Sequence, residues 1–178
     1  MSEAVISLPH DLKAMLRVVE DAEVSDDLRV AAAGAVLHVL SAGNAIPGVR
    51  GVLQRVGDAL LLRLVLDRLR RDDSESFERH REDSPELLDP LEEQLEAARG
   101  YLGDRLAVLE RFADGFPKLT VQGHSANECV ADPESMNWLY GAVLEAIVDR
   151  FEFDEDDVAR ELKSIDRILP HLENRIVR

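Results

Sequence analysis

The stretch that decides the fold is residues 26–71, DDLRVAAAGAVLHVLSAGNAIPGVRGVLQRVGDALLLRLVLDRLRR. Its first part, residues 28–40, and its last part, residues 52–69, are apolar on most sides of a helix, as is typical of buried helices. Residues 41–51 between them hold three glycines, an asparagine and a proline, which end a helix and favour a turn. Two helices joined by a short turn pack side by side in opposite directions. The stretch therefore predicts an apolar helical hairpin at the centre of the core.

Apolar residues at helical spacing continue on both sides of the hairpin. They predict helices after Ser7, after Ser84 and after Asp132, with a further one near the C-terminus. Gly100 and Gly103 lie where the apolar phase shifts, so we expect a kink or a break in the helix there. Residues 114–132 contain glycine and proline, and we expect a long loop without a strand pair. The sequence thus predicts an all-α bundle of about six or seven helices around the hairpin.

The composition is that of a globular helical protein. The chain has 178 residues, 46% of them hydrophobic and only 4% aromatic, and Leu, Val and Ala supply most of the apolar content. Such a composition favours helices over a β-sandwich. The single cysteine, Cys129, excludes an internal disulfide and fits a reducing compartment.

The charge is distributed unevenly along the chain. The formal net charge is −15, and all of it lies in residues 72–178, since residues 1–71 hold equal numbers of acids and bases. Residues 72–84 contain one apolar side chain, and we interpret them as a polar linker or a helical extension between a neutral region, 1–71, and an acidic region, 85–178, which could pack together as one domain. A field of this sign repels phosphate backbones, which makes nucleic acid a poor partner.

The chain is expected to be soluble and cytoplasmic. Its N-terminus has no basic segment followed by an apolar stretch of signal-peptide length. The longest apolar regions carry charged residues or are too short to span a bilayer. The all-round hydrophobicity of the hairpin leaves peripheral membrane attachment as an alternative.

His124, Glu128 and Cys129 lie within six residues and are the candidate metal-ligating or nucleophilic set, with His80 as a further ligand. A zinc site needs three or four converging ligands, usually in recognisable pairs, and no such pair is present. We therefore expect no metal, no cofactor and no catalytic residue, and a solvated loop with a buried thiol. His38 is interpreted as a core histidine bonded to the backbone.

Leucines form a coiled-coil-like seam in the acidic region. Leu88, Leu91, Leu95 and Leu102 recur at spacings that place them on one face of a helix, whereas Glu92, Glu93 and Glu96 fall off that face and should contact water. The seam could pack within the chain or pair with a second copy.

The turn of the hairpin resembles the motif of the bacterial YkvA-like family, whose domain has no known function. Ser41, Ile46, Pro47, Asp58 and Ala59 match the motif S-P-x-D-x-I-P-D followed by x-I-P-x-x-G-x-x-D-D-A. An alanine-rich helix precedes it and a leucine-rich helix follows it, as in the family. Ala42 and Asn44 stand where the family has proline and aspartate, and four further signature positions, including Gly48, also differ. The resemblance covers about a quarter of the chain and implies a helical hairpin with a bent turn. It carries over no activity.

The absence of a converging polar set leads to one main hypothesis and two alternatives. The main hypothesis is a non-catalytic protein-interaction or scaffold module, acting as a homodimer through the leucine seam. The alternatives are a metal protein or enzyme using His124, Glu128 and Cys129, and a peripheral membrane protein.

Overall fold

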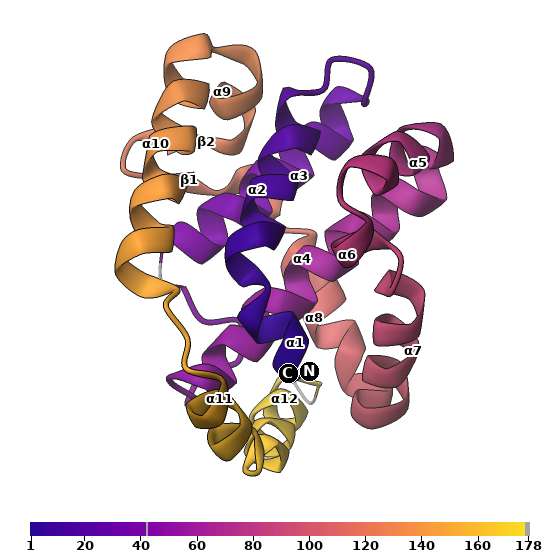
Figure 1. The fold of residues 1–178 in the computed structure, drawn as a ribbon, viewed down its shortest axis with the longest axis vertical. Helices are drawn as coiled ribbons and strands as arrows, with labels where there is room; N and C mark the ends of the chain where they lie inside the picture. Colours follow the sequence, from indigo (N-terminus) through magenta and orange to yellow (C-terminus); the bar gives the residue numbers. More distant parts are fainter. Residues whose placement is uncertain (42, 177–178) are drawn as a thin grey trace.

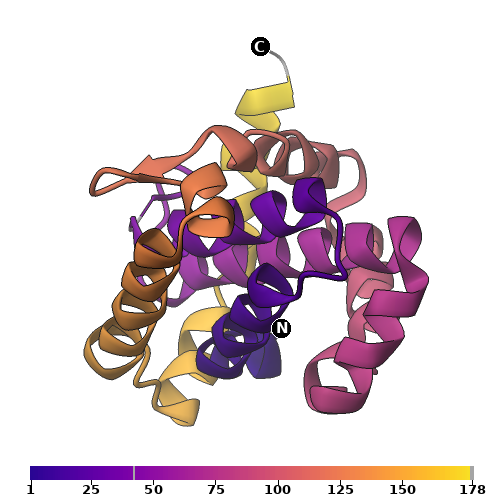
Figure 2. The same cartoon turned by 90° about the horizontal axis from the view of Figure 1, so that it is seen from above.

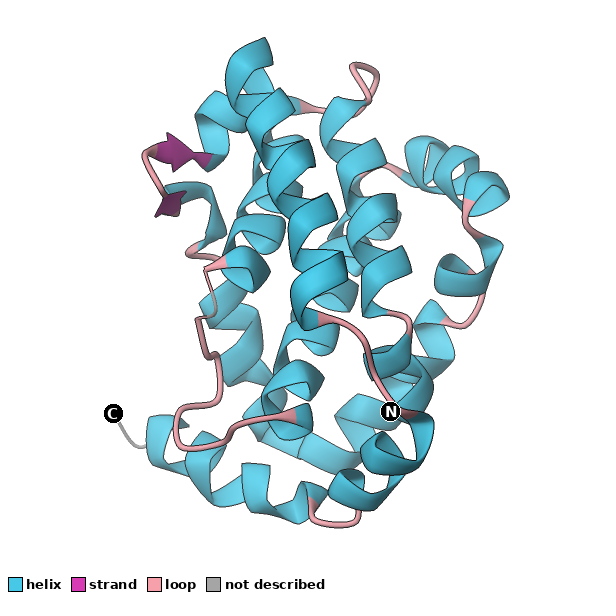
Figure 3. Ribbon diagram, turned by 60° about the vertical axis from the view of Figure 1, so that its left-hand side comes forward, coloured by secondary structure: helices cyan, strands magenta, loops and turns pink. Residues whose placement is uncertain are grey.

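The computed structural model describes residues 1–41 and 43–176 (Figure 1). These residues are 79% helical and include a small two-stranded ladder (Figure 3). The all-α prediction is confirmed. The structure divides the chain more finely than the expected bundle, because several short helices precede or interrupt the long ones.

The helical hairpin is the centre of the molecule. Helix α3 (Asp26–Leu40) and helix α4 (Val52–Asp72) bury nearly all of their apolar residues on every side, and the other helices surround the pair (Figure 2). Gly34 permits a close approach here, since a Cβ at this position would lie 2.2 Å from the carbonyl oxygen of Phe116. The 3₁₀ turn η2 (Phe116–Lys118) therefore lies directly against the middle of α3.

Two helices precede the hairpin. Helix α2 (Leu8–Glu20) begins next to Ser7 as predicted, with Pro9 in its first turn. Helix α1 (Ser2–Ile6) comes before it and was not predicted, because five residues are too few to display a helical period. Ala4 and Val5 of α1 are buried against the rest of the chain.

Of the two alternatives for residues 72–84, a linker or a helical extension, the structure shows a helix that packs on the core. Helix α5 (Ser74–Asp83) buries Ser76, Phe77 and His80. The Nε2 atom of His80 lies 3.0 Å from Oδ2 of Asp21, which ties α5 to the end of α2. Hydrogen-bonded polar side chains of α5 thus cover part of the core. The spacing of apolar residues in the sequence does not reveal this packing.

The leucine seam spans helix α6 (Pro85–Leu88) and helix α7 (Leu91–Leu102). The predicted break follows at Gly103, which has a φ of 55°. The short 3₁₀ turn η1 (Gly103–Arg105) begins at this residue. Helix α8 (Leu106–Ala113) then continues to η2.

Residues 114–132 are more ordered than a long loop. Strands β1 (Thr120–Val121) and β2 (His124–Ser125) pair antiparallel around Gln122 and Gly123, which both have positive φ, as two-residue hairpin turns require. The short helix α9 (Ala126–Ala131) follows, so the expectation of a solvated loop without a strand pair is wrong.

Three more helices follow within the residues that the structure describes. They are the long helix α10 (Pro133–Arg150), helix α11 (Glu155–Leu162) and helix α12 (Ile168–Ile176), with the 3₁₀ turn η3 (Ile165–Arg167) between the last two. Within residues 1–41 and 43–176, no helix is both long and apolar enough to cross a bilayer. The hairpin that motivated the membrane alternative is covered by other helices (Figure 2).

Candidate functional site

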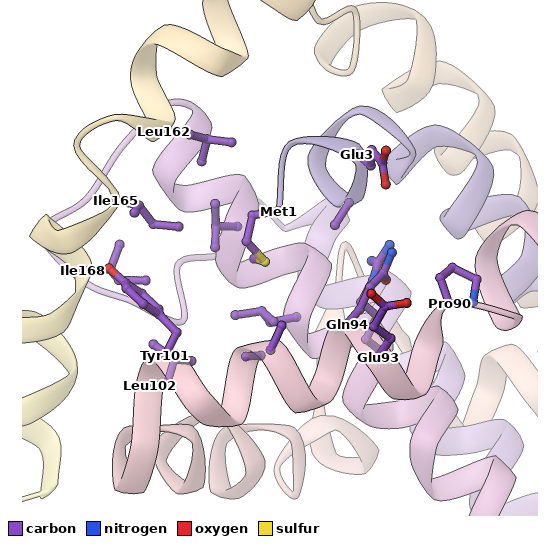
Figure 4. Close-up of a pocket in the computed structure, with 16 residues that line it drawn as sticks. Met1, Glu3, Pro90, Glu93, Gln94, Tyr101, Leu102, Leu162, Ile165 and Ile168 are labelled. Carbon is purple, nitrogen blue, oxygen red and sulfur yellow. The ribbon is translucent and has the colours of Figure 1, made fainter.

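A cavity of about 560 Å³ lies where α1, α4 and α7 meet the C-terminal helices (Figure 4). Its volume falls within the range of small-molecule sites in proteins. The residues around it come from both ends and the middle of the chain: Met1, Glu3, Ala4, Val56, Leu60, Arg63, Pro90, Glu93, Gln94, Ala97, Ala98, Tyr101, Leu102, Leu162, Ile165 and Ile168.

The two ends of this cavity differ in polarity. Leu162, Ile165 and Ile168 make one end apolar, and the side chain of Met1 points between the two ends (Figure 4). Glu93 and Glu3 lie toward the other end. Both carboxylates are exposed and neither forms an ion pair within the described part of the chain. The cavity is therefore an apolar space with an acidic rim.

Arg63 lines the cavity from α4 and is held by a network of hydrogen bonds. Its side chain is 2% exposed and donates to Oδ2 of Asp11 at 2.9 Å and to the carbonyl oxygen of Ala59 at 3.1 Å. It also donates to Oε1 of Gln94 at 2.5 Å and, more weakly, to Oγ of Ser7 at 3.4 Å. This network joins α2, α4 and α7 beneath the acidic rim and fixes the positions of their side chains.

Asp11 is the buried partner of Arg63. Burial raises the pKa of Asp11, and the charge of Arg63 and the hydrogen bonds from Arg63 and Ser7 offset only part of that effect. The Oδ2 atom of Asp11 accepts from Ser7 at 3.1 Å as well, whereas Oδ1 is buried without a hydrogen-bond partner. The charge of Arg63 is thus neutralised by Asp11. The carboxylates of Glu3 and Glu93 at the rim have no cationic partner in the described chain.

Tyr101 stands beside the apolar end of the cavity. Its hydroxyl donates to Oδ1 of Asp166 at 2.5 Å, which joins α7 to η3 across the opening. Burial and this hydrogen bond raise the pKa of Tyr101 to about 12. The phenol therefore stays protonated near neutral pH and acts as a donor.

The predicted set His124, Glu128 and Cys129 is divided among three structural roles. The Nδ1 atom of His124 lies 3.0 Å from Oγ of Ser135, and its ring stacks on Trp138 with the centroids 4.1 Å apart. Glu128 caps α9, because its Oε2 accepts from the Ser125 amide at 2.8 Å while the Ser125 hydroxyl accepts from the Glu128 amide at 3.1 Å.

Cys129 is fully buried in the core, and burial, with a smaller effect from the charge of Glu128, raises the pKa of its thiol to about 11. A thiol in this state is a poor nucleophile near neutral pH. His80, the further candidate ligand, is bonded to Asp21 on a different helix. Among the residues that the structure describes, no group of three or more His, Cys, Asp or Glu side chains could hold a metal ion.

The residues that carry the YkvA-like resemblance shape the turn of the hairpin. The hydroxyl of Ser41 donates to the carbonyl oxygen of His38 at 2.7 Å and accepts from the Gly43 amide at 3.1 Å. Ile46 is buried, and Pro47 is exposed. Position 42 lies outside the described residues. These positions shape the turn.

Asp58 and His38 form a buried polar pair between α4 and α3. The Nε2 atom of His38 lies 3.5 Å from Oδ1 of Asp58, and the other carboxylate oxygen accepts from Nη1 of Arg55 at 2.8 Å. The His38 ring also packs on Phe112 and Phe116. His38 is a core histidine as expected, but its Nε2 faces a carboxylate instead of a backbone carbonyl.

The leucine seam packs within the chain. Leu91 and Leu95 are completely buried, and Leu88 and Leu102 are 4% and 1% exposed. The seam is therefore not available to a second copy, which corrects the expected dimer contact. Glu92, Glu93 and Glu96 are exposed as predicted.

The chain was compared with protein-family models, with curated proteins and with solved structures, and no match was found.

The cavity is the feature that sequence reasoning missed. Its lining residues come from segments that are far apart in the sequence, and no sequence motif joins them. The acidic residues Glu3 and Glu93 carry no signal in the sequence either, because the chain is acidic in many places.

Proposed function

We propose that this chain is a non-catalytic binding protein that holds a small amphiphilic molecule in the cavity between α1, α4, α7 and the C-terminal helices. The single observation that supports the proposal most is the polarity of that cavity. A concave apolar space next to a few placed polar groups is the usual design of small-molecule sites. The reducing location inferred from Cys129 is part of the same proposal.

The charge at the rim favours a ligand with a cationic end. Glu3 and Glu93 are free to pair with an ammonium or similar group, whereas the only cationic side chain of the lining, Arg63, is already bonded to Asp11. The apolar end offers Leu162, Ile165 and Ile168 to a hydrocarbon body. An anionic amphiphile of the same length would meet repulsion at the rim.

A pair of probes of equal chain length tests this polarity. Octyltrimethylammonium and octanoate, both below the concentrations at which they form micelles, are titrated into the full chain by calorimetry. Saturable binding of the cation, at least fivefold tighter than binding of octanoate, is the expected result. Equal binding of the two probes would refute the charge assignment, and no saturable binding of either would refute the proposed function.

Two variants of α7 and a matched control sharpen the test. Glu93→Gln removes a carboxylate from the rim and should weaken binding of the cation several-fold. Glu96→Gln removes the same charge from the exposed side of α7, which does not line the cavity, and should change nothing. Ala97→Phe, at an exposed lining position, should obstruct entry without disturbing the core. Equal effects of the two glutamate variants would show that the net charge acts, and not the rim.

A second candidate function is protein binding through helix α10. Tyr140, Leu144 and Val148 recur every four residues on this helix and are 44%, 45% and 74% exposed. Glu145 and Asp149 flank them and are exposed too. Like charges would oppose one another if two copies met on this face, so we propose a partner helix with an apolar face and basic flanks.

The single tryptophan, Trp138, lies on the same helix beside this surface, and its fluorescence gives a measurement of binding to α10. A synthetic amphipathic helix of leucine and lysine should change the fluorescence of Trp138 saturably, and Leu144→Ser should weaken that binding at least fivefold. A scrambled peptide of the same composition is the control. Equal binding of the scrambled peptide, or a dimeric mass of the free chain by light scattering that Leu144→Ser abolishes, would contradict the proposed partner.

A further inference from the structure

A second hollow, of about 350 Å³, lies between the turn of the hairpin and the C-terminal helices. It shares no residue with the apolar cavity. Its walls come from the turn before α4, from the first turns of α4, and from α11, η3 and α12, which lie together at one end of the molecule (Figure 1). The residues around it are Gly48, Val49, Arg50, Leu53, Glu161, Ser164, Arg167 and His171.

The hollow gathers positive charge on an acidic protein. Arg50 and Arg167 come from segments more than a hundred residues apart, and neither forms an ion pair or a side-chain hydrogen bond in the described chain. Most of the other described arginines contact a carboxylate, as Arg70 and Arg99 contact Asp67. The sequence has 36 acidic and 21 basic residues, so most arginines have a carboxylate nearby. Two arginines that line one hollow without an ion pair depart from this pattern.

Histidine 171 adds a third nitrogen group, and its position is fixed by packing. Gly48 has a φ of 93°, and a Cβ on it would lie 2.4 Å from Cε1 of His171. The imidazole therefore lies directly on the backbone of Gly48, where only a glycine leaves room for it.

One carboxylate from the chain itself already lies in the hollow. The Oε2 atom of Glu161 accepts from the Val52 amide at 3.1 Å. Glu161 is the only acidic side chain in the lining, and it is engaged with the backbone instead of with Arg50 or Arg167. The lining thus accommodates one carboxylate, and the guanidinium groups of Arg50 and Arg167 remain without an anionic partner in the described chain.

We propose that this hollow binds a phosphate-type oxyanion, either as free phosphate or as the phosphate of a small phosphomonoester. Guanidinium groups match the geometry of phosphate oxygens and donate two parallel hydrogen bonds to them. Arg50 from the turn before α4 and Arg167 from η3 supply these donors, Ser164 supplies a hydroxyl, and His171 supplies a ring nitrogen. The volume exceeds that of a single phosphate ion, so the hollow also has room for a small organic group. This site is separate from the proposed amphiphile cavity and does not depend on it.

Inorganic phosphate is the first probe, titrated into the full chain in a phosphate-free buffer, with sodium chloride holding the ionic strength constant. Saturable binding by calorimetry and by phosphorus NMR line broadening is expected. Arg50→Gln and Arg167→Gln should each weaken it about fivefold, and the double variant should abolish it. Arg111→Gln removes another exposed arginine, which lies outside the hollow, and should leave the affinity unchanged.

Glu161→Gln provides an independent variant. The amide oxygen of glutamine can still accept from the Val52 amide, while the negative charge that opposes an incoming anion is lost, so phosphate binding should tighten severalfold. A phosphomonoester such as glycerol phosphate, compared with vesicles of phosphatidic acid, distinguishes a small ligand from a lipid headgroup. Tighter binding of the small ester than of the vesicles supports the proposal. Absence of saturable phosphate binding, or binding that persists in the double arginine variant, would overturn it.

Discussion

The buried pair of Arg63 and Asp11 gives the sharpest prediction of the structure. In Arg63→Leu, the Asp11 carboxylate remains in the core with only the Ser7 hydroxyl to donate to it, while the carbonyl of Ala59 and the amide of Gln94 lose a donor. Removing one partner of a buried ion pair costs about 3–5 kcal/mol in the free energy of unfolding. Gln94 is half-buried and can turn to water, so most of the cost comes from Asp11.

The double variant Asp11→Leu with Arg63→Leu should recover most of that loss. It leaves neither charge unpaired in the core, and leucine is apolar at both positions. Replacement of a whole buried pair by apolar residues is often neutral or stabilising. We therefore expect the double variant to be more stable than either single variant, by about 2 kcal/mol or more.

Urea unfolding at pH 7, followed by far-ultraviolet circular dichroism, measures all four proteins of this cycle. A repeat at pH 5 adds a sign test. The folded chain holds the proton of Asp11 more tightly than the unfolded chain does, since burial raises the pKa of Asp11 above 3.8. The penalty is therefore fully present above the folded pKa and is lost as the pH falls through it, and loss of Arg63 raises that pKa further. The cost of Arg63→Leu should shrink at pH 5. Strictly additive single effects, or a cost that grows at pH 5, would refute the reasoning.

Three further predictions concern single buried residues. Leu95→Ala should lower the free energy of unfolding by about 2–5 kcal/mol while the mass by light scattering stays that of the parent, and a lower mass would show that the seam does pair with a second copy. Gly34→Ala should destabilise more than an ordinary surface change, because its Cβ would lie 2.2 Å from the Phe116 carbonyl oxygen; an unchanged urea midpoint would contradict that packing. The thiol of Cys129 is buried with a pKa of about 11, so at pH 8 it should react with a disulfide reagent only as fast as the chain unfolds, and immediate modification of the native protein would disprove its burial.

The central hairpin could be predicted from the sequence because its two helices are apolar all round and the turn between them is rich in glycine. The break at Gly103 was visible for a similar reason, since the apolar phase shifts where the backbone needs a positive φ. Both features are local in the chain, and local patterns decide them.

The sequence left residues 72–84 open between a linker and a helical extension, and the β-hairpin was missed, because tertiary contacts decide both. Helix α5 has one apolar side chain, Phe77, and it is anchored by polar contacts such as the one between His80 and Asp21. The two strands are only two residues long, and their one local signal is Gly123 in the turn. Residue types that can bind metals lie close together at 124–129, but capping and burial give each of them a different structural role.

The apolar cavity and the second hollow could not be predicted, because each is assembled from segments that are distant in sequence. Arg50 and Arg167 are ordinary surface residues until the fold brings their segments to the same place. The spacing of residues in the sequence predicts which side chains are neighbours on one helix, but it does not predict contacts between distant segments.

The apolar cavity has one wall from α1 and another from Leu162, Ile165 and Ile168. These two walls come from segments that are far apart along the chain. An occupant would therefore link helix α1 to the segment around Ile165 by contacting both, and its loss should loosen both.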